Sequence, residues 1–264
     1  MYIKYIILVV IILYICFKTD NLYEIFKIRN LSNVDWSKYD LFRMSNNRKV
    51  TKINESLIIV DNFYANPDKI RRYCLDNKNK FKTIFPLYRS NVYNPMLNYD
   101  ASYSLIKYFK NISKQKISKA IWNYDILKES NGYFQFITKN ANPVIHYDRH
   151  WGVIIFLHPN PEKNSGTNFY KNKKLKISKA MSIDEAENKY NKNQIDKINV
   201  EKKKSLWKEG EKSKFNRWEK TFEIENKYNR ALIFDGRNFH CSQGGFGDKI
   251  ENSRLFQTFF FAPI

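Results

Sequence analysis

The second half of the chain is a succession of short runs of aromatic and β-branched residues bounded by Asn, Gly or Pro. Such runs are typical of strands, because these side chains pack well on a pleated surface and the bounding residues favour turns. The runs cover residues 133–137, 144–148, 152–157, 230–234 and 254–261. This half of the chain is therefore expected to form a β-sheet core.

The first half predicts one more strand and two helices. Residues 57–60 are apolar and largely β-branched, which indicates a strand. Asn66 and Pro67 provide an N-cap and a proline at the first position of a helix, and apolar residues at helical spacing follow. A second helix is expected over 102–109. The pattern predicts an α+β fold in a single domain that covers 57–264.

An uninterrupted apolar run, residues 5–17, lies near the amino terminus between Lys4 and Lys18. It falls short of the roughly 20 residues that span a bilayer, but flanking apolar residues lengthen it. We interpret residues 1–20 as a signal-anchor of a single-pass membrane protein. A cleavable signal peptide and a buried core helix are the alternatives, and the first lacks its small-residue cleavage site. Residues 21–56 are expected to be a stalk and lead-in.

Positive charge is spread widely and is dense in one block. The 264 residues include 46 Lys and Arg against 26 Asp and Glu, a formal net charge of +20. Residues 171–230 hold 18 Lys and Arg against 10 Asp and Glu. We interpret 171–227 as a basic helical insertion between core strands, with a capping box at Ser182–Glu185. Such charge favours acidic polypeptides, anionic lipid head groups or nucleic acid as partners. The simpler interpretation is that the block is a solvated surface segment.

A His-x-Asp sequence and a distant histidine carry the clearest chemical signal. In a strand, His146 and Asp148 project from the same face. His240 follows the apolar strand at 230–234 and can supply a second imidazole. Two histidines and one carboxylate that leave three of six positions open are the ligand set of non-haem Fe(II) oxygenases. The three scattered cysteines argue against a thiolate zinc site or a disulfide framework.

Other possible ligand sets fit the sequence less well. His146 and His150 are four residues apart, as in a helical zinc motif, but Tyr147 stands where that motif requires glutamate. His150 and His158 are better explained as a surface or supporting histidine and a turn histidine. Asp235 could replace Asp148 in another triad, but it lies in an Asp-Gly turn.

An arginine after the second histidine suggests an anionic co-substrate. Arg254 begins the last predicted strand, and its planar fork could bind a carboxylate at two points. Arg230 and Arg237 are rival anchors. Tyr133 and Gln135, which share a face of the strand before His146, are candidates to line the same cavity or to belong to the core.

The order His-x-Asp, distant His, then Arg resembles the Fe(II)/2-oxoglutarate-dependent dioxygenase superfamily. The turn at 166–170 is similar to the glycine-containing turn of that superfamily, and residues 60–67, Arg89-Ser90 and 228–234 resemble a prolyl-4-hydroxylase-like branch. The resemblance implies a double-stranded β-helix (jelly roll), Fe(II) held by His146, Asp148 and His240, and 2-oxoglutarate anchored by Arg254. The 92 positions between Asp148 and His240 exceed the usual spacing, because the basic insertion lies between them.

The resemblance also implies an activity. We expect a hydroxylase that uses O2 and 2-oxoglutarate to modify a C–H bond, most plausibly on a prolyl or lysyl side chain of a protein, in a domain facing a lumen. Nucleic acid is a less favoured partner. A second hypothesis is a membrane-tethered, inactive barrel whose basic surface recruits an anionic partner. A third is a zinc hydrolase that uses the same histidines.

Overall fold

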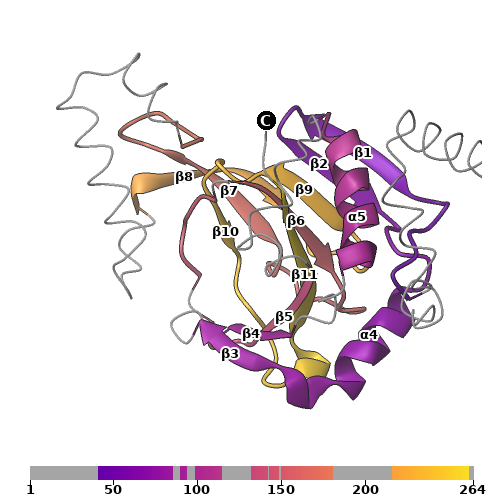
Figure 1. The fold of residues 1–264 in the computed structure, drawn as a ribbon. Coiled ribbons are helices and arrows are strands. Elements are labelled where there is room, and N and C mark those ends of the chain that lie inside the picture. Colours follow the sequence, from indigo (N-terminus) through magenta and orange to yellow (C-terminus); the bar gives the residue numbers. More distant parts are fainter. Residues whose placement is uncertain are drawn as a thin grey trace, which may run out of the picture. The chain divides into compact units, whose positions relative to one another are not determined.

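Antiparallel pairing joins the strands of this chain into two sheets (Figure 1). The computed structural model describes residues 41–85, 90–93, 99–114, 132–141, 143–148, 150–180 and 216–261. They belong to one unit, Leu41–Ile264. The elements in chain order are β1 (Lys49–Asn54), β2 (Leu57–Asp61), α4 (Pro67–Asp76), a 3-10 turn (Lys78–Lys80), β3 (Lys82–Phe85), β4 (Ser90–Tyr93), α5 (Tyr99–Ile112), β5 (Tyr133–Ile137), β6 (Trp151–Phe156), β7 (Thr167–Asn172), β8 (Trp218–Ile224), β9 (Ala231–Asp235), β10 (His240–Ser242), a 3-10 turn (Ile250–Asn252) and β11 (Arg254–Phe261).

The larger sheet has eight described strands in the order β1-β2-β9-β6-β11-β5-β4-β3, and the smaller has three in the order β10-β7-β8. Both sheets are antiparallel, and the described part of the chain is rich in strands with few helices, which is compatible with a jelly roll. Strands distant in sequence pair at the centre, since β9 lies between β2 and β6, and β11 lies between β6 and β5.

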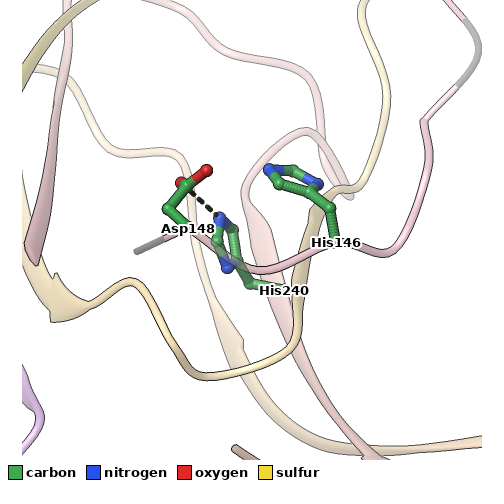
Figure 2. Close-up of side chains that lie close together, drawn as sticks. All are labelled: His146, Asp148 and His240. Carbon is green, nitrogen blue, oxygen red and sulfur yellow. Dashed lines mark ion pairs between the residues drawn. The ribbon is translucent and has the colours of Figure 1, made fainter. Parts of the chain in front are cut away.

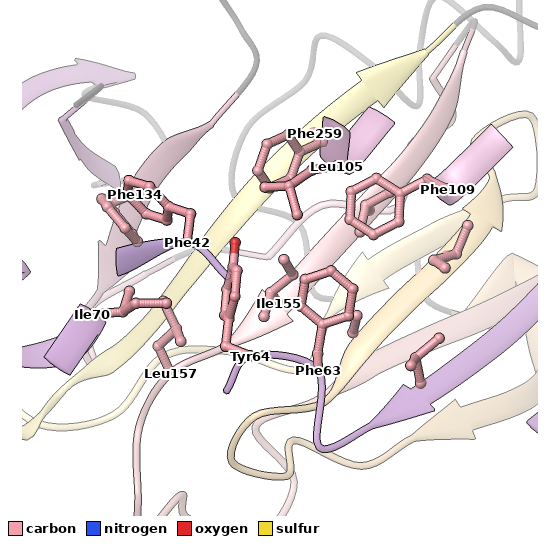
Figure 3. Packing of buried hydrophobic residues seen from close by; sticks show 14 of the residues in the cluster. Phe42, Phe63, Tyr64, Ile70, Leu105, Phe109, Phe134, Ile155, Leu157 and Phe259 are labelled. Atoms are coloured by element: carbon pink, nitrogen blue, oxygen red, sulfur yellow. The ribbon is translucent and has the colours of Figure 1, made fainter. Parts of the chain in front are cut away.

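One face of the large sheet packs against the helices. Val153, Ile155 and Phe259 point to this helix face and share a cluster with Phe109 of α5 and Ile70 of α4. Phe63 stacks on Phe109 with ring centroids 5.4 Å apart, and Figure 3 shows both rings in this cluster. The helix face therefore holds the main hydrophobic core.

The opposite face of the large sheet, here called the cavity face, is turned toward the small sheet. Phe156, Phe234 and Phe256 alternate with the residues of the helix face and cluster with Phe169 and Ile224 of the small sheet. This second cluster is smaller than the first. Room for a site therefore remains between the two sheets.

Side-chain bonds tie β2 and its following turn to the turn before β9. Arg230 donates two hydrogen bonds to Asp61, over 2.7 and 3.2 Å. Asn229 accepts from the peptide N–H of Tyr64 at 2.8 Å and donates to the Tyr64 carbonyl at 2.9 Å. These bonds join residues 60–67 to residues 228–234, two of the segments that carried the family resemblance.

Several predicted boundaries differ from the structure. The folded unit begins at Leu41 instead of Leu57, because Leu41 and Phe42 are buried in the main core and β1 pairs with β2. The predicted stalk therefore contributes a strand. The predicted insertion at 171–227 begins inside β7 and includes β8, which pairs along the whole of β7.

The predicted strand over 144–148 is also different. Within 144–148, only His146 forms a β-bridge, an isolated antiparallel one with His240. The signal-anchor at 1–20, the capping box at 182–185 and Arg89 lie outside the described residues. Among the residues that the structure describes, no helix is long and apolar enough to cross a membrane.

Candidate metal centre

Two histidines from distant segments are held face to face by their own backbones. The peptide N–H of His146 donates to the carbonyl of His240 at 2.9 Å, and the N–H of His240 donates to the carbonyl of His146 at 2.8 Å. Their ring centroids are 4.3 Å apart. His240 begins β10, so the small sheet fixes one imidazole and the bridge fixes the other.

Asp148 is positioned by the turn after β9. Its peptide N–H donates to the carbonyl of Gly236 at 2.8 Å, and the N–H of Gly236 donates to the carbonyl of His150 at 3.1 Å. A Cβ on Gly236 would lie 2.1 Å from the His150 carbonyl oxygen and 2.8 Å from the Asp148 Cβ. Glycine is therefore required for the backbone to approach the Asp148 segment this closely.

The three side chains converge on one point (Figure 2). Their candidate ligand atoms all lie within 4.8 Å of one another. His240 Nε2 is 3.4 Å from Asp148 Oδ2, and the His240 side chain is buried whereas Asp148 is part-exposed. Two imidazole nitrogens and a carboxylate at this spacing fit a divalent transition metal with open positions.

Backbone carbonyls select the tautomer of both histidines. Nδ1 of His146 lies 2.8 Å from the Val144 carbonyl oxygen, and Nδ1 of His240 lies 2.8 Å from that of Asn238. A carbonyl can only accept a hydrogen bond, so each Nδ1 carries the hydrogen and each neutral ring keeps its Nε2 lone pair free. This is the outer arrangement that orients metal-ligating histidines.

The protonation states also favour metal binding. Burial lowers the pKa of His146, and the neighbouring His240 lowers it further, so its ring is neutral at pH 7. Burial acts to raise the pKa of Asp148, but the surrounding imidazoles of His240, His146 and His150 outweigh it and leave the pKa below the usual value. A neutral imidazole and an ionised carboxylate are the ligand forms that a metal requires.

The three residues open into a cavity of about 460 Å³ between the sheets. Arg254 lies in the same cavity wall and is 2% exposed. It donates to the Ser242 hydroxyl at 2.6 Å and to the Gly166 carbonyl at 3.2 Å. Burial lowers its pKa to about 10, so the guanidinium is still charged at neutral pH.

Arg254 differs from its two rivals in its counter-ions. Arg230 is paired with Asp61, and Arg237 is paired with Asp235. Arg254 makes no ion pair with any carboxylate in the part of the chain that the structure describes, and its Nε has no hydrogen-bond partner there. A buried cation without a counter-ion is costly, which favours an anionic ligand at this place.

Comparison with known proteins identifies the chain as a member of a family. A family model described as a family of unknown function (DUF6445) matches residues 43–260. The chain belongs to the DUF6445 family. No curated protein matches it.

Among solved structures, the DUF6445 chain is similar to HygX from Streptomyces hygroscopicus. One HygX structure holds nickel, 2-oxoglutarate and hygromycin B, and it aligns with 12% identity and a TM-score of 0.40 over 79% of this chain and 83% of HygX. Another holds iron and aligns with 11% identity and a TM-score of 0.38, over 79% and 82% of the two chains.

Of the remaining predicted site residues of the DUF6445 chain, some line the cavity and others do not. Gln135 lines the cavity and donates to the Thr258 hydroxyl at 3.0 Å. Tyr133 lies on the same strand but is not among the cavity-lining residues. His158 packs on Phe246, outside the cavity.

Sequence reasoning missed three residues that shape the site. Gly236 admits Asp148, Ser242 accepts from Arg254, and Thr167 lies in the cavity wall opposite Ser242 in the β7–β10 ladder. The Asp-Gly pair at 235–236 was noticed only as a turn. Thr167 lies in the segment 166–170 that carried the family resemblance, but nothing in the sequence assigned this residue to the site.

Proposed function

We propose that this protein is an Fe(II)- and 2-oxoglutarate-dependent oxygenase that hydroxylates a C–H bond. One observation carries the proposal. A 2-His-1-carboxylate set, with both Nε2 lone pairs free, shares a cavity with a buried guanidinium that has no carboxylate partner among the described residues. One cavity therefore contains both the groups that can bind a metal and the group that can bind an anionic co-substrate.

His146, Asp148 and His240 would hold Fe(II). The set consists of nitrogen and carboxylate donors without thiolate, which suits non-haem iron. Fe(II), when bound with 2-oxoglutarate and O2, supplies the oxidation that places one oxygen atom on the substrate and the other in succinate, with release of CO2. The protein's own residues fix the ligands, bind the co-substrate and exclude water.

Arg254 would pair with the far carboxylate of 2-oxoglutarate. Its guanidinium carbon lies over two aromatic rings, 4.8 Å from the centroid of Phe256 and 5.5 Å from that of Phe156. These rings shield the cation from water, so an ion pair formed there is stronger than one at the surface. Planar guanidinium groups bind carboxylates at two points, which would also orient the co-substrate.

The fold proposed for this chemistry is the double-stranded β-helix. The two antiparallel sheets face each other across the cavity. His240 begins β10 of the small sheet, and His146 and Asp148 lie in the segment between β5 and β6 of the large sheet. We also propose residues 1–20 as a signal-anchor, with the folded domain in a lumen, where a protein substrate would be available.

The lining of the cavity supports an uncharged reactive group on the substrate. Apart from the metal ligands and Arg254, the described lining residues are apolar or neutral, and they include Ile137, Pro143, Tyr147 and Phe260. Asp148 is the one carboxylate among them. A lysyl ammonium would have no free counter-ion, so a prolyl or other neutral aliphatic side chain is favoured over lysine.

The proposal is tested by anaerobic thermal unfolding of the full chain with and without Fe(II) plus 2-oxoglutarate. At about 100 times Kd, binding should stabilise the fold by roughly 2.7 kcal/mol. We expect a shift in the wild type that is lost in His240→Ala and Arg254→Ala. Without a shift in a folded wild-type protein, the oxygenase proposal fails and the inactive basic binding module becomes the better hypothesis. Activity with zinc and without 2-oxoglutarate would instead favour the hydrolase.

A further inference from the structure

The turn that follows β7, residues 172–177 and here called the lysine turn, carries positive charge without counter-ions. Residues 167–180 contain five lysines and no aspartate or glutamate. Lys173, Lys174 and Lys176 are exposed, and the ion pairs that lysines make within the described part of the chain all involve other lysines. Because neighbouring like charges repel, these three lysines gain favourable interactions only when an anion binds.

The lysine turn is closed by hydrogen bonds around one buried asparagine. The Asn172 side chain accepts from the N–H groups of Lys174 at 3.0 Å and Leu175 at 2.9 Å. The Asn172 N–H donates to the carbonyl of Ile177 at 2.8 Å, and the Asn172 carbonyl accepts from the N–H of Lys176 at 2.8 Å. The backbone that carries the lysines is therefore ordered before a partner binds, which reduces the entropy lost on binding.

The chain after the lysine turn is attached to the segment that leads into the metal ligand His240. The N–H of Phe239 donates to the carbonyl of Ser178 at 3.0 Å. The N–H of Ala180 donates to the carbonyl of Arg237 at 2.8 Å. The lysine turn is thus held beside the candidate metal centre by backbone pairing.

Aromatic residues connect the same turn to the cavity wall. Tyr147 lines the cavity and packs on Phe239 with ring centroids 6.0 Å apart. Phe239 packs on Trp218 at 4.7 Å, and Trp218 pairs with Asn172 at the start of the lysine turn. Tyr147 is part-exposed, so this wall of the cavity reaches the surface. An extended polypeptide with one side chain in the cavity can reach the lysines with nearby residues, since each residue spans about 3.3 Å.

The chemistry of the lysine turn favours carboxylates over nucleic acid. Its cations are all ammonium groups, whereas guanidinium groups are preferred for the recognition of nucleic acid. Single strands also stack their bases on aromatic side chains. The rings beside the turn, Trp218 and Phe239, already pack in one cluster with Tyr147. A polypeptide that carries aspartate or glutamate is therefore the better match.

We propose that the lysine turn binds acidic residues of a polypeptide substrate whose neutral side chain enters the cavity. The inference rests on the proposed function, since the substrate side chain must reach the metal centre. It narrows the substrate class to proteins with aspartate or glutamate close to the modified residue. Lys173, Lys174 and Lys176 then bind the substrate and take no part in the chemistry.

The test is fluorescence anisotropy of the full chain with two labelled peptides. In one peptide a central proline is flanked by alternating glycine and glutamate, and in the other glutamine replaces glutamate. The wild type should bind the glutamate peptide more tightly, and added salt should weaken this binding. The combined variant Lys173→Gln, Lys174→Gln, Lys176→Gln should raise the Kd for the glutamate peptide roughly tenfold, as for the loss of about three surface ion pairs. Its Kd for the glutamine peptide should stay at the wild-type value.

The combined variant Lys49→Gln, Lys82→Gln, Lys107→Gln is the matched control. It removes the same charge from exposed lysines of β1, β3 and α5. Both of its Kd values should stay close to those of the wild type. If the two combined variants weaken binding equally, net charge alone explains the binding and the inference is overturned.

Other outcomes also decide the question. Equal binding of the two peptides by the wild type, or an unchanged Kd for the glutamate peptide in the lysine-turn variant, overturns the inference and leaves the proposed function intact. Tighter binding of single-stranded oligothymidylate than of the glutamate peptide, lost in the lysine-turn variant, overturns it in favour of nucleic acid. If the combined variant does not fold, Lys173→Gln with Lys174→Gln is measured by the same criteria.

The proposed function is tested separately in the same proteins. The lysine turn contributes no residue to the cavity lining, so its variant should keep the wild-type thermal shift with Fe(II) and 2-oxoglutarate. Absence of that shift in the wild type overturns the proposed function and, with it, the assignment of the bound peptide as a substrate. Binding of the glutamate peptide would then belong to the inactive basic binding module.

Discussion

His146 and His240 exchange both of their backbone hydrogen bonds, although 94 positions separate them in the chain. The bridge does not depend on the imidazoles. Removing either ring should therefore leave the backbone arrangement in place and delete only a metal ligand. Because the backbone bridge and the imidazoles are independent, the proposed metal centre can be tested by substituting either histidine with alanine.

The first prediction concerns these two rings. His146→Ala and His240→Ala should each weaken Fe(II) binding by more than the roughly 10–100-fold that the loss of an outer partner costs, because a ligand itself is lost. Calorimetric titration of Fe(II) into each variant under anaerobic conditions measures this. His158→Ala, which removes a ring outside the cavity, should bind Fe(II) as the wild type does. Normal Fe(II) affinity in His240→Ala would exclude the proposed centre.

The second prediction concerns the glycine behind Asp148. Gly236→Ala places a methyl group 2.1 Å from the His150 carbonyl oxygen, so the turn and the Asp148 segment must separate. We expect a loss of roughly 1–3 kcal/mol in the free energy of unfolding, as for other overpacked sites, together with weaker Fe(II) binding. Urea denaturation and Fe(II) titration measure the two effects.

Gly152→Ala serves as the comparison for this substitution. Its added Cβ would meet only the ring edge of Phe234, at 3.1 Å, and so should cost less. A Gly236→Ala protein with wild-type stability and Fe(II) affinity would show that the close approach is not needed.

The third prediction is a pH dependence of stability from Asp235. Burial acts to raise the pKa of this carboxyl, but hydrogen bonds from Arg237 and Lys179 outweigh it and lower the pKa below the ordinary value of 3.8. The stabilisation is therefore complete above pH 3.8 and is lost as the pH falls through the lower pKa of the folded state.

Asp235→Asn should be less stable than the wild type at pH 7. Below pH 3.8, its free energy of unfolding should fall less steeply than that of the wild type. Urea midpoints measured from pH 6 downward test both points. Parallel pH profiles for the two proteins would show that another carboxyl governs the acid transition.

Sequence patterns found the strands that are buried on one or both faces. Strands β2, β5, β6, β9 and β11 were predicted because their aromatic and β-branched side chains are consecutive and pack in the two cores. Strand β8 was missed, since five of its seven residues are exposed and three of these are charged, which resembles a solvated helix or loop. Strands β7 and β10 are largely buried but were also absent from the predicted runs, because β7 is mostly polar and β10 has three residues. A strand is visible in the sequence when it contains a sustained run of apolar side chains.

The three candidate ligand residues were predicted from their order in the sequence, but the sequence did not indicate how they are arranged. His146 was expected in a regular strand, whereas it lies in an irregular segment joined to β10 by one bridge. Pairings between residues far apart, such as Thr167 with Ser242 and Asp148 with Gly236, depend on how the sheets close. Local patterns contain no information about such contacts, so the pairing of Thr167 with Ser242 and the required glycine became visible only in the structure.

The last prediction separates binding from stability at Arg254. Arg254→Met keeps a long apolar stem among Phe156 and Phe256 and removes a buried charge without a counter-ion among the described residues. The ligand-free protein should be as stable as the wild type or more stable by about 1 kcal/mol, because the desolvation cost of the cation disappears. Binding of 2-oxoglutarate should fall at least about 100-fold with the loss of the charged pair.

Arg230→Met is the control for this substitution, because it removes the two hydrogen bonds from Arg230 to Asp61 and leaves that carboxylate only its contact with Lys227, so it should reduce stability with little effect on 2-oxoglutarate binding. Urea denaturation without ligand and anaerobic calorimetry with 2-oxoglutarate measure the two quantities for both variants. A large loss of stability in ligand-free Arg254→Met would show that the bonds to Ser242 and Gly166 outweigh the cost of burying the charge. Arg254 would then be a structural residue, and the cavity would not require an anion.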